Sequence, residues 1–96
     1  MLNISLSKDA KNFITHLPKK HAKQIVVKIK ELSITGHAQD SKLLHSSNGK
    51  YFRVDSGEYR IIYQKQNDEL LILLAGKRND NEIYKLFSRK NGLNKN

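Results

Sequence analysis

The sequence of 96 residues has no cysteine and only one proline, Pro18. The absence of cysteine excludes disulfides, a cysteine-based zinc site and thiol chemistry. A chain without these crosslinks must be held together by packing alone, as is usual for cytosolic domains. Because the chain is short, we expect a single domain with one modest core over residues 1–90, followed by a polar tail at 91–96.

Long apolar runs are also missing. The longest of them, 61–63 and 70–75, fall far short of the ~20 residues that a helix needs to span a bilayer. Residues 1–6 lack the basic region and the long apolar region of a secretory signal peptide. We therefore expect a soluble, cytoplasmic protein with no membrane partner.

Acidic residues are scarce relative to basic ones. Nine Asp and Glu stand against 18 Lys and Arg, which gives a net charge of +9. Such an excess opposes compactness by self-repulsion and makes a polyanionic partner plausible. Nucleic acid is the first candidate and an acidic protein the second, while a generally basic, soluble surface is the plain alternative.

Two helices are predicted in the N-terminal part, after a short strand. Apolar and polar residues alternate over 2–6, as in a strand, and Ser7 can cap the helix that follows. Pro18 separates this helix from a second one, which Gly36 can end because glycine tolerates a positive φ. The apolar residues at helical spacing are Ala10, Phe13, Ile14 and Leu17 in the first helix and Ala22, Ile25, Val26, Ile29 and Leu32 in the second.

The second half of the chain predicts a sheet and a final helix. Residues 37–50 look irregular, with Leu43 and Leu44 against the core and a turn at 46–49. The predicted strands are 50–55, 58–65 and 69–75, with hairpin turns at 55–58 and 66–69 and a last helix at 79–90. The stretch 70–75 lacks alternation, so we expect a central strand that is covered on both faces.

These elements give the order βααβββα and an α+β fold. We expect an antiparallel sheet with the N-terminal helical hairpin packed on one face. The second face would then be free for a ligand, a partner or the last helix.

Cationic side chains gather on the predicted hairpin over residues 51–63. If Phe52 and Val54 face the helices, Arg53 faces the open side of the sheet. Arg60 on the next strand can then lie beside Arg53, where the two guanidinium groups repel each other unless an anion lies between them. The alternative is that Arg60 forms an ordinary ion pair, for which the candidate partners are Asp55, Glu58 and Asp68.

A second group follows the last predicted strand. Gly76 permits a sharp exit, and Arg78 then stands at a strand end, where its permanent charge can bind phosphate at two points. Tyr84 is either a core residue with its hydroxyl at the surface or, among arginines, a base with a lowered pKa. A phosphodiester transition state needs cations for the phosphate and a proton carrier. The candidate catalytic residues are Arg53, Arg60, Arg78 and Tyr84.

The sequence offers little else that carries chemistry. The four histidines do not form metal-ligand spacings with carboxylates. No Gly-rich phosphate loop, Ser-His-Asp pattern or acidic metal cluster is visible. We therefore expect neither a metal nor a cofactor. His45 could approach the open face of the sheet and transfer a proton.

Three parts of the sequence carry a family resemblance. They are residues 51–63, Tyr-Phe-Arg-Val-Asp-Ser-Gly-Glu-Tyr-Arg-Ile-Ile-Tyr, residues 76–84, Gly-Lys-Arg-Asn-Asp-Asn-Glu-Ile-Tyr, and Pro18 with its helix. Together they resemble the RelE/ParE toxin superfamily. The resemblance covers nearly the whole chain, in order. It implies the same fold and a type II toxin that a cognate acidic antitoxin neutralises. RelE-like members cleave mRNA in the ribosomal A site without metal. The 2′-hydroxyl attacks its own 3′ phosphate, which leaves a 2′,3′-cyclic phosphate and a free 5′-hydroxyl.

Carried over to this sequence, the resemblance implies that Arg60 and Arg78 stabilise charge on the phosphate, with Arg78 also a candidate donor to the leaving oxygen. Tyr84 matches a tyrosine that stacks on the nucleotide and assists proton transfer. Arg53 stands where a family lysine is the candidate base, and an arginine stays protonated. The proton acceptor is therefore left open between Tyr84 and His45. The implied RNA-binding residues are Tyr51, at another common lysine position, with Lys50, Lys77 and His45.

Three functions are compatible with this sequence. The first is a ribosome-dependent mRNA endoribonuclease, and the ending from Gly76 to Tyr84 favours it. The second is a ParE-like inhibitor of DNA gyrase, which acts by binding and shares the fold. The third is a catalytically silent homologue that binds an antitoxin, and the replaced lysines at positions 51 and 53 motivate it.

Overall fold

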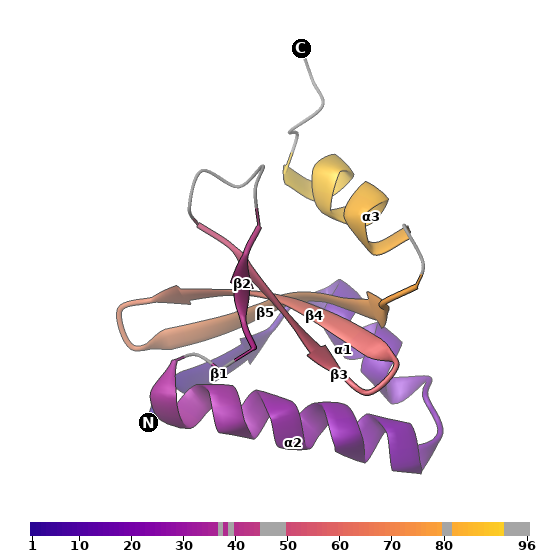
Figure 1. Ribbon diagram of the computed structural model, residues 1–96, viewed down its shortest axis with the longest axis horizontal. Coiled ribbons are helices and arrows are strands. Elements are labelled where there is room, and N and C mark those ends of the chain that lie inside the picture. The colour runs from indigo at the N-terminus through magenta and orange to yellow at the C-terminus, as the bar shows by residue number, and fades with distance from the viewer. Residues whose placement is uncertain (37, 39, 45–49, 80–81, 92–96) are drawn as a thin grey trace.

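The computed structural model describes residues 1–36, 38, 40–44, 50–79 and 82–91. It shows an α+β fold in which helices cover both faces of a five-stranded mixed sheet (Figure 1). The elements are β1 Asn3–Leu6, α1 Lys8–Thr15, α2 Lys19–Thr35, β2 Lys42–Leu43, β3 Phe52–Ser56, β4 Tyr59–Gln66, β5 Glu69–Lys77 and α3 Glu82–Asn91. Within the described residues, none of the helices has the length and apolar character that crossing a membrane requires.

The strand order across the sheet is β1-β5-β4-β3-β2. The predicted antiparallel meander is confirmed, because β3 pairs with β4 and β4 with β5 in antiparallel fashion. The expectation of an entirely antiparallel sheet was wrong, since β1 runs parallel to β5. The hairpin turns that fix strand direction are local signals. No such turn joins β1 to a neighbouring strand, so the sequence pattern left its direction undetermined.

The predicted helix boundaries at Ser7, Pro18 and Gly36 are confirmed. The Ser7 hydroxyl accepts a hydrogen bond from the backbone N–H of Ala10 at 3.1 Å and caps α1. Pro18 immediately precedes α2, and Gly36 ends it with a φ of 86°. Ser7 also donates its hydroxyl proton to the carbonyl of Leu73, which ties the start of α1 to β5.

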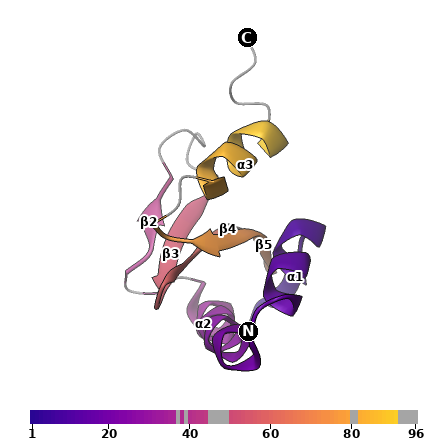
Figure 2. The same cartoon turned by 90° about the vertical axis from the view of Figure 1, so that its right-hand side faces the viewer.

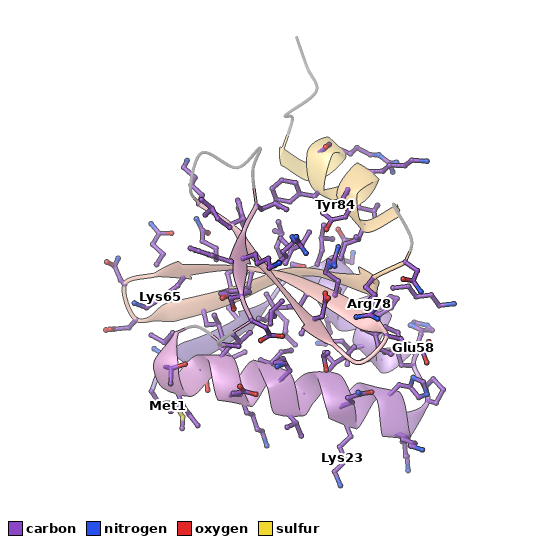
Figure 3. The ribbon with its side chains drawn as sticks, in the orientation of Figure 1. Met1, Lys23, Glu58, Lys65, Arg78 and Tyr84 are labelled. Atoms are coloured by element: carbon purple, nitrogen blue, oxygen red, sulfur yellow. The ribbon has the colours of Figure 1, made fainter. Side chains whose placement is uncertain are left out.

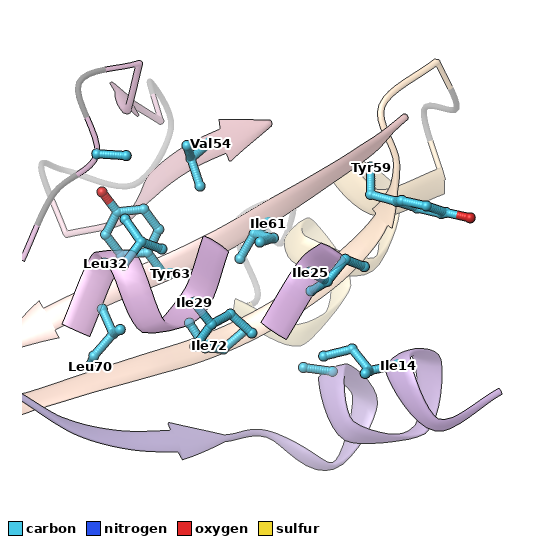
Figure 4. Packing of buried hydrophobic residues seen from close by; sticks show 12 residues of the cluster. Ile14, Ile25, Ile29, Leu32, Val54, Tyr59, Ile61, Tyr63, Leu70 and Ile72 are labelled. Carbon is cyan, nitrogen blue, oxygen red and sulfur yellow. The ribbon is translucent and has the colours of Figure 1, made fainter. Parts of the chain in front are cut away.

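The larger core lies between the sheet and the two N-terminal helices (Figure 4). Apolar residues of α1 and α2 meet every second residue of the central strands, as the alternation predicted. The buried side chains of this cluster are Ala10, Ile14, Ile25, Ile29, Leu32, Ala38, Val54, Tyr59, Ile61, Tyr63, Leu70 and Ile72.

A second, smaller core occupies the opposite face of the sheet, where α3 packs (Figure 2). Its buried residues are Leu44, Ile62, Leu73, Leu74, Ile83 and Phe87. Of the occupants considered for this face, the last helix therefore covers part of it. The prediction that β5 is central and covered on both faces is confirmed.

A bulge on β5 explains why its apolar run does not alternate. Ile62 pairs with Leu74 and Tyr63 pairs with Ile72, so Leu73 has no direct partner on β4. The extra residue reverses the in–out phase of the strand. Leu73 and Leu74 consequently both join the smaller core, although they are adjacent in sequence.

The segment before β3 differs from its prediction. It contains a short strand, β2, which pairs with β3 where irregular structure was expected. Leu44 is buried as predicted, whereas Leu43 is 49% exposed and does not join the core. Leu43 lies on an edge strand, which no further strand covers within the described chain. The predicted turn at 46–49 lies outside the described residues.

Candidate functional site

The register of the β3–β4 hairpin sets the centre of the candidate site. Asp55 pairs directly with Arg60, and Arg53 pairs with Ile62. The prediction that the two arginines lie side by side across the ladder was therefore wrong. The structure shows the alternative, an ion pair between Arg60 and Asp55, which joins Nε to Oδ1 at 2.7 Å and the terminal Nη2 to Oδ2 at 3.3 Å. A guanidinium held at two points has a fixed orientation.

Tyr84 meets the same guanidinium from α3. Arg60 donates from Nη1 to the Tyr84 hydroxyl at 2.5 Å, and its central carbon lies 5.8 Å from the centroid of the Tyr84 ring. The ring also packs against the smaller core. Tyr84 is thus partly a core residue, as one interpretation held, and its hydroxyl is part of an arginine cluster, as the other held.

Arg78 reaches the site from the end of β5 (Figure 3). Its backbone N–H donates to the carbonyl of Glu58 at 2.9 Å, which fixes the chain beside the hairpin turn. Its Nη1 lies 3.7 Å from Oδ2 of Asp55, and half of its side chain is exposed. A Cβ added at Gly76 would lie 3.3 Å from Cβ of Ile83, so glycine allows α3 to approach β5 closely.

The charges of the site are strongly coupled. The hydrogen bond from Arg60 lowers the pKa of Asp55 against the opposing effect of burial, and the charges of Arg60, Arg78 and Arg53 lower it further. In turn, the hydrogen bond to Asp55 raises the pKa of Arg60. The Asp55 carboxylate and the Arg60 guanidinium are therefore both ionised at neutral pH. One carboxylate among three guanidinium groups leaves an excess of positive charge.

Four of the predicted residues lie outside this arginine cluster or outside the described residues. Tyr51 lies at the edge of the smaller core, with its ring edge-on to Phe87 at a centroid distance of 5.2 Å. Lys50 is exposed and precedes β3. Lys77 pairs with Tyr59, whose side chain belongs to the core on the opposite face, so the structure does not bring Lys77 to the arginine cluster. His45 lies outside the described residues.

Asp55 is the residue that sequence reasoning missed as part of this site, because it was considered only as an ordinary ion-pair partner. The signal was present in the sequence. A two-residue hairpin loop at Gly57 and Glu58 pairs Ser56 with Tyr59 and then Asp55 with Arg60. The predicted turn at 55–58, centred one residue earlier, would instead pair Arg53 with Arg60. The observed turn has Gly57 at a φ of 61°, and its register is the one that brings the carboxylate to Arg60.

No family model and no curated protein matches this sequence. Solved structures do match it. The free-state structure of an E. coli RelE toxin mutant has a TM-score of 0.75 and 17% identity, over 93% of this chain and 96% of that one. The YoeB dimer from Staphylococcus aureus has a TM-score of 0.66 and 22% identity, over 76% of this chain and 92% of that one. The RelB–RelE antitoxin–toxin complex from Methanococcus jannaschii has a TM-score of 0.65 and 22% identity, over 86% of this chain and 98% of that one. The chain therefore has the fold of the RelE-like toxins.

Proposed function

We propose that this protein is the toxin of a type II toxin–antitoxin system and acts as a ribosome-dependent, metal-independent mRNA endoribonuclease. The observation that carries the proposal is the cluster of Arg60, Arg78 and Tyr84 on a RelE-like fold. Two ionised guanidinium groups and a phenolic hydroxyl on one face of a sheet suit a reaction at a phosphodiester.

The proposed reaction is the attack of a 2′-hydroxyl on its neighbouring phosphorus. The bond from phosphorus to the 5′-oxygen breaks, so that a 2′,3′-cyclic phosphate and a 5′-hydroxyl form. The proton lost by the 2′-oxygen is balanced by the proton gained by the 5′-oxygen. Negative charge builds up on the phosphate oxygens, and Arg60 and Arg78 stabilise it from fixed positions.

Tyr84 is the proton carrier in this proposal. Its oxygen accepts a hydrogen bond from Arg60, so its own hydroxyl proton remains available for the leaving 5′-oxygen. The phenolate that is left, beside the Arg60 guanidinium, takes the proton of the 2′-oxygen. Arg53 and Arg60 cannot accept a proton at neutral pH. The half-exposed Arg78 is the first of the three arginines that a phosphate from solvent can reach.

A cognate antitoxin is the second partner that we propose. The RelE and YoeB neighbours include the RelBE complex of E. coli and the YoeB–YefM complex of Staphylococcus aureus. A net charge of +9 favours an acidic polypeptide, which would bind by charge complementarity and could fold on binding.

Primer extension on an mRNA translated in vitro tests the nuclease. We compare the wild type with Arg78→Ala and with Lys77→Ala as the matched control, since Lys77 carries the same charge one residue earlier on the other face. Wild type and Lys77→Ala should cut within codons and only when ribosomes are present, and Arg78→Ala should not cut. Equal cutting by Arg78→Ala would contradict the assignment of Arg78.

A catalytically silent, antitoxin-binding homologue is the second candidate function. The observation that favours it is Asp55, whose carboxylate lies against both Arg60 and Arg78. An uncut message, together with harmless overexpression of the folded protein, would support this function. DNA damage with intact mRNA would instead indicate gyrase inhibition.

A further inference from the structure

Asp55 occupies the position between Arg60 and Arg78 that a bound phosphate would need. Its Oδ1 lies 2.7 Å from Nε of Arg60, and its Oδ2 lies 3.7 Å from Nη1 of Arg78. Carboxylates and phosphates bind the planar guanidinium group in the same two-point manner. The site therefore already contains an anion, which the protein itself supplies.

Most of the hydrogen-bond donors of Arg60 already have partners within the protein. A guanidinium group has five N–H donors, and its Nε and Nη2 edge is the one that Asp55 contacts. Nη1 donates to the Tyr84 hydroxyl. The side chain of Arg60 is only 16% exposed, whereas those of Asp55 and Arg78 are 31% and 50% exposed. A phosphate can reach Arg78 directly, but it finds the two-point edge of Arg60 already in use.

We propose that Asp55 is an internal competitor for phosphate that sets the ligand specificity of this site. A phosphodiester first binds Arg78 and gains the two-point contact with Arg60 only when it displaces the Asp55 carboxylate. A free phosphate has too few other contacts to offset that displacement. A polynucleotide can offset it with further phosphates and bases, so the site selects a polynucleotide over small phosphate compounds.

This inference depends on the proposed function, because it assumes that the arginine cluster binds the phosphates of RNA. For the variant without the Asp55 carboxylate, it predicts the opposite change in phosphate binding from the one that a purely structural role of Asp55 would give. If Asp55 only orients Arg60, its loss weakens phosphate binding. If it competes with phosphate, its loss strengthens binding.

Fluorescence anisotropy with a short, 2′-O-methylated single-stranded RNA tests the competition. This probe cannot be cleaved, because the attacking hydroxyl is blocked. We compare the wild type with Asp55→Asn and with Glu58→Gln, which removes the same charge from the exposed tip of the same hairpin. Asp55→Asn should bind about tenfold more tightly than the wild type, equivalent to ~1.4 kcal/mol. Glu58→Gln should gain no more than about twofold, as expected for one exposed charge that salt screens.

Inorganic phosphate, added as a competitor, measures the specificity. After correction for the affinity of each protein for the probe, phosphate should displace the probe from Asp55→Asn at a clearly lower concentration than from the wild type. The proposal is overturned if Asp55→Asn binds the probe no better than Glu58→Gln, if it binds more weakly than the wild type, or if none of the three proteins binds it.

A measurement on the wild type keeps the test valid if Asp55→Asn does not fold. The Nε resonance of Arg60 in a nitrogen-15 NMR spectrum reports the hydrogen bond to Asp55. Titration with the methylated RNA should shift this resonance together with that of Arg78. A shift at Arg78 with no change at Arg60 would mean that Asp55 stays in place, and it would overturn the proposal.

The two proposals can fail separately. If messages stay uncut but Asp55→Asn gains RNA affinity, the nuclease fails and the competition stands. If Arg78→Ala abolishes cleavage but Asp55→Asn behaves like Glu58→Gln, the nuclease stands and the competition fails.

Discussion

Asp55 and Arg60 face each other across the β3–β4 ladder, and their side chains form a two-point ion pair at 2.7 and 3.3 Å. The same guanidinium donates to Tyr84 on α3. One side chain thus connects the hairpin to the helix that covers the smaller core. Changes at this pair should affect both the stability of the fold and the chemistry of the site.

Asp55→Asn should lower stability in a pH-dependent way. The folded pKa of Asp55 lies below that of an unfolded aspartate, so the folded state favours the ionised form. The stabilisation is fully present above the unfolded pKa of ~3.9 and is lost as the pH falls through the lower, folded value. The free energy of unfolding from urea titration should differ by about 1 kcal/mol at pH 7, the usual net size of one hydrogen-bonded contact.

The pH series supplies the check on that prediction. The difference between wild type and Asp55→Asn should stay constant from pH 7 to pH 5 and shrink below pH ~4, where the unfolded aspartate takes up its proton. Glu58→Gln serves as the control, because this residue lies at the exposed turn. A difference that stays constant into acid would show that the charge of Asp55 is not what stabilises the fold.

Tyr84→Phe should separate chemistry from folding. The ring keeps its packing against the smaller core, and only the hydroxyl that accepts from Arg60 is lost. Loss of a positioned proton carrier lowers the rate by about 10²–10⁴-fold, whereas one hydrogen bond is worth about 1 kcal/mol of stability. Single-turnover cleavage and thermal unfolding measure the two effects.

Tyr59→Phe is the matched control for Tyr84→Phe. Its hydroxyl lies 2.7 Å from Nδ1 of His21, in the core on the other face of the sheet. This variant should lose a similar amount of stability and keep its cleavage rate. Equal cleavage by both variants would remove Tyr84 from the reaction.

Gly57→Ala should destabilise the hairpin that sets the Asp55–Arg60 register. Gly57 has a φ of 61°, which costs an L-residue about 1–2 kcal/mol. An added Cβ would also lie 2.3 Å from Nε2 of Gln24, which must move away. Chemical unfolding of Gly57→Ala in the wild-type and Gln24→Ala backgrounds separates the two causes. A smaller loss in the second background measures the steric part, and no loss in either would contradict the backbone argument.

The fold was largely predictable because its determinants are local. Ser7, Pro18 and Gly36 bound the helices through side-chain capping, the fixed φ of proline and a positive φ, each of which a few residues determine. The features that the sequence did not predict depend on longer-range packing. The direction of β1 is set by its pairing with β5, and the bulge at Leu73 is set by the register of two strands.

The site shows the same division. Alternation put Arg53 and Asp55 on one face of β3, but only the exact register shows that Asp55 rather than Arg53 faces Arg60. The contact between Arg60 and Tyr84 depends on how α3 docks over Gly76, and no local pattern encodes that docking. The position of Lys77 could have been predicted, since alternation along β5 turns it away from the face of Gly76.

Arg60→Lys should be far more damaging than Arg78→Lys, although both keep the positive charge. Arg60 uses three of its nitrogens at once, two for Asp55 and one for Tyr84, and a lysine ammonium cannot reproduce that planar arrangement. The half-exposed side chain of Arg78 lies 3.7 Å from Asp55, a contact that a flexible ammonium can approach. Cleavage by Arg60→Lys should therefore fall nearly as far as in Arg60→Ala, while Arg78→Lys should retain measurable activity. Similar rates for the two lysine variants would show that charge alone, and not the fixed geometry of Arg60, supports the reaction.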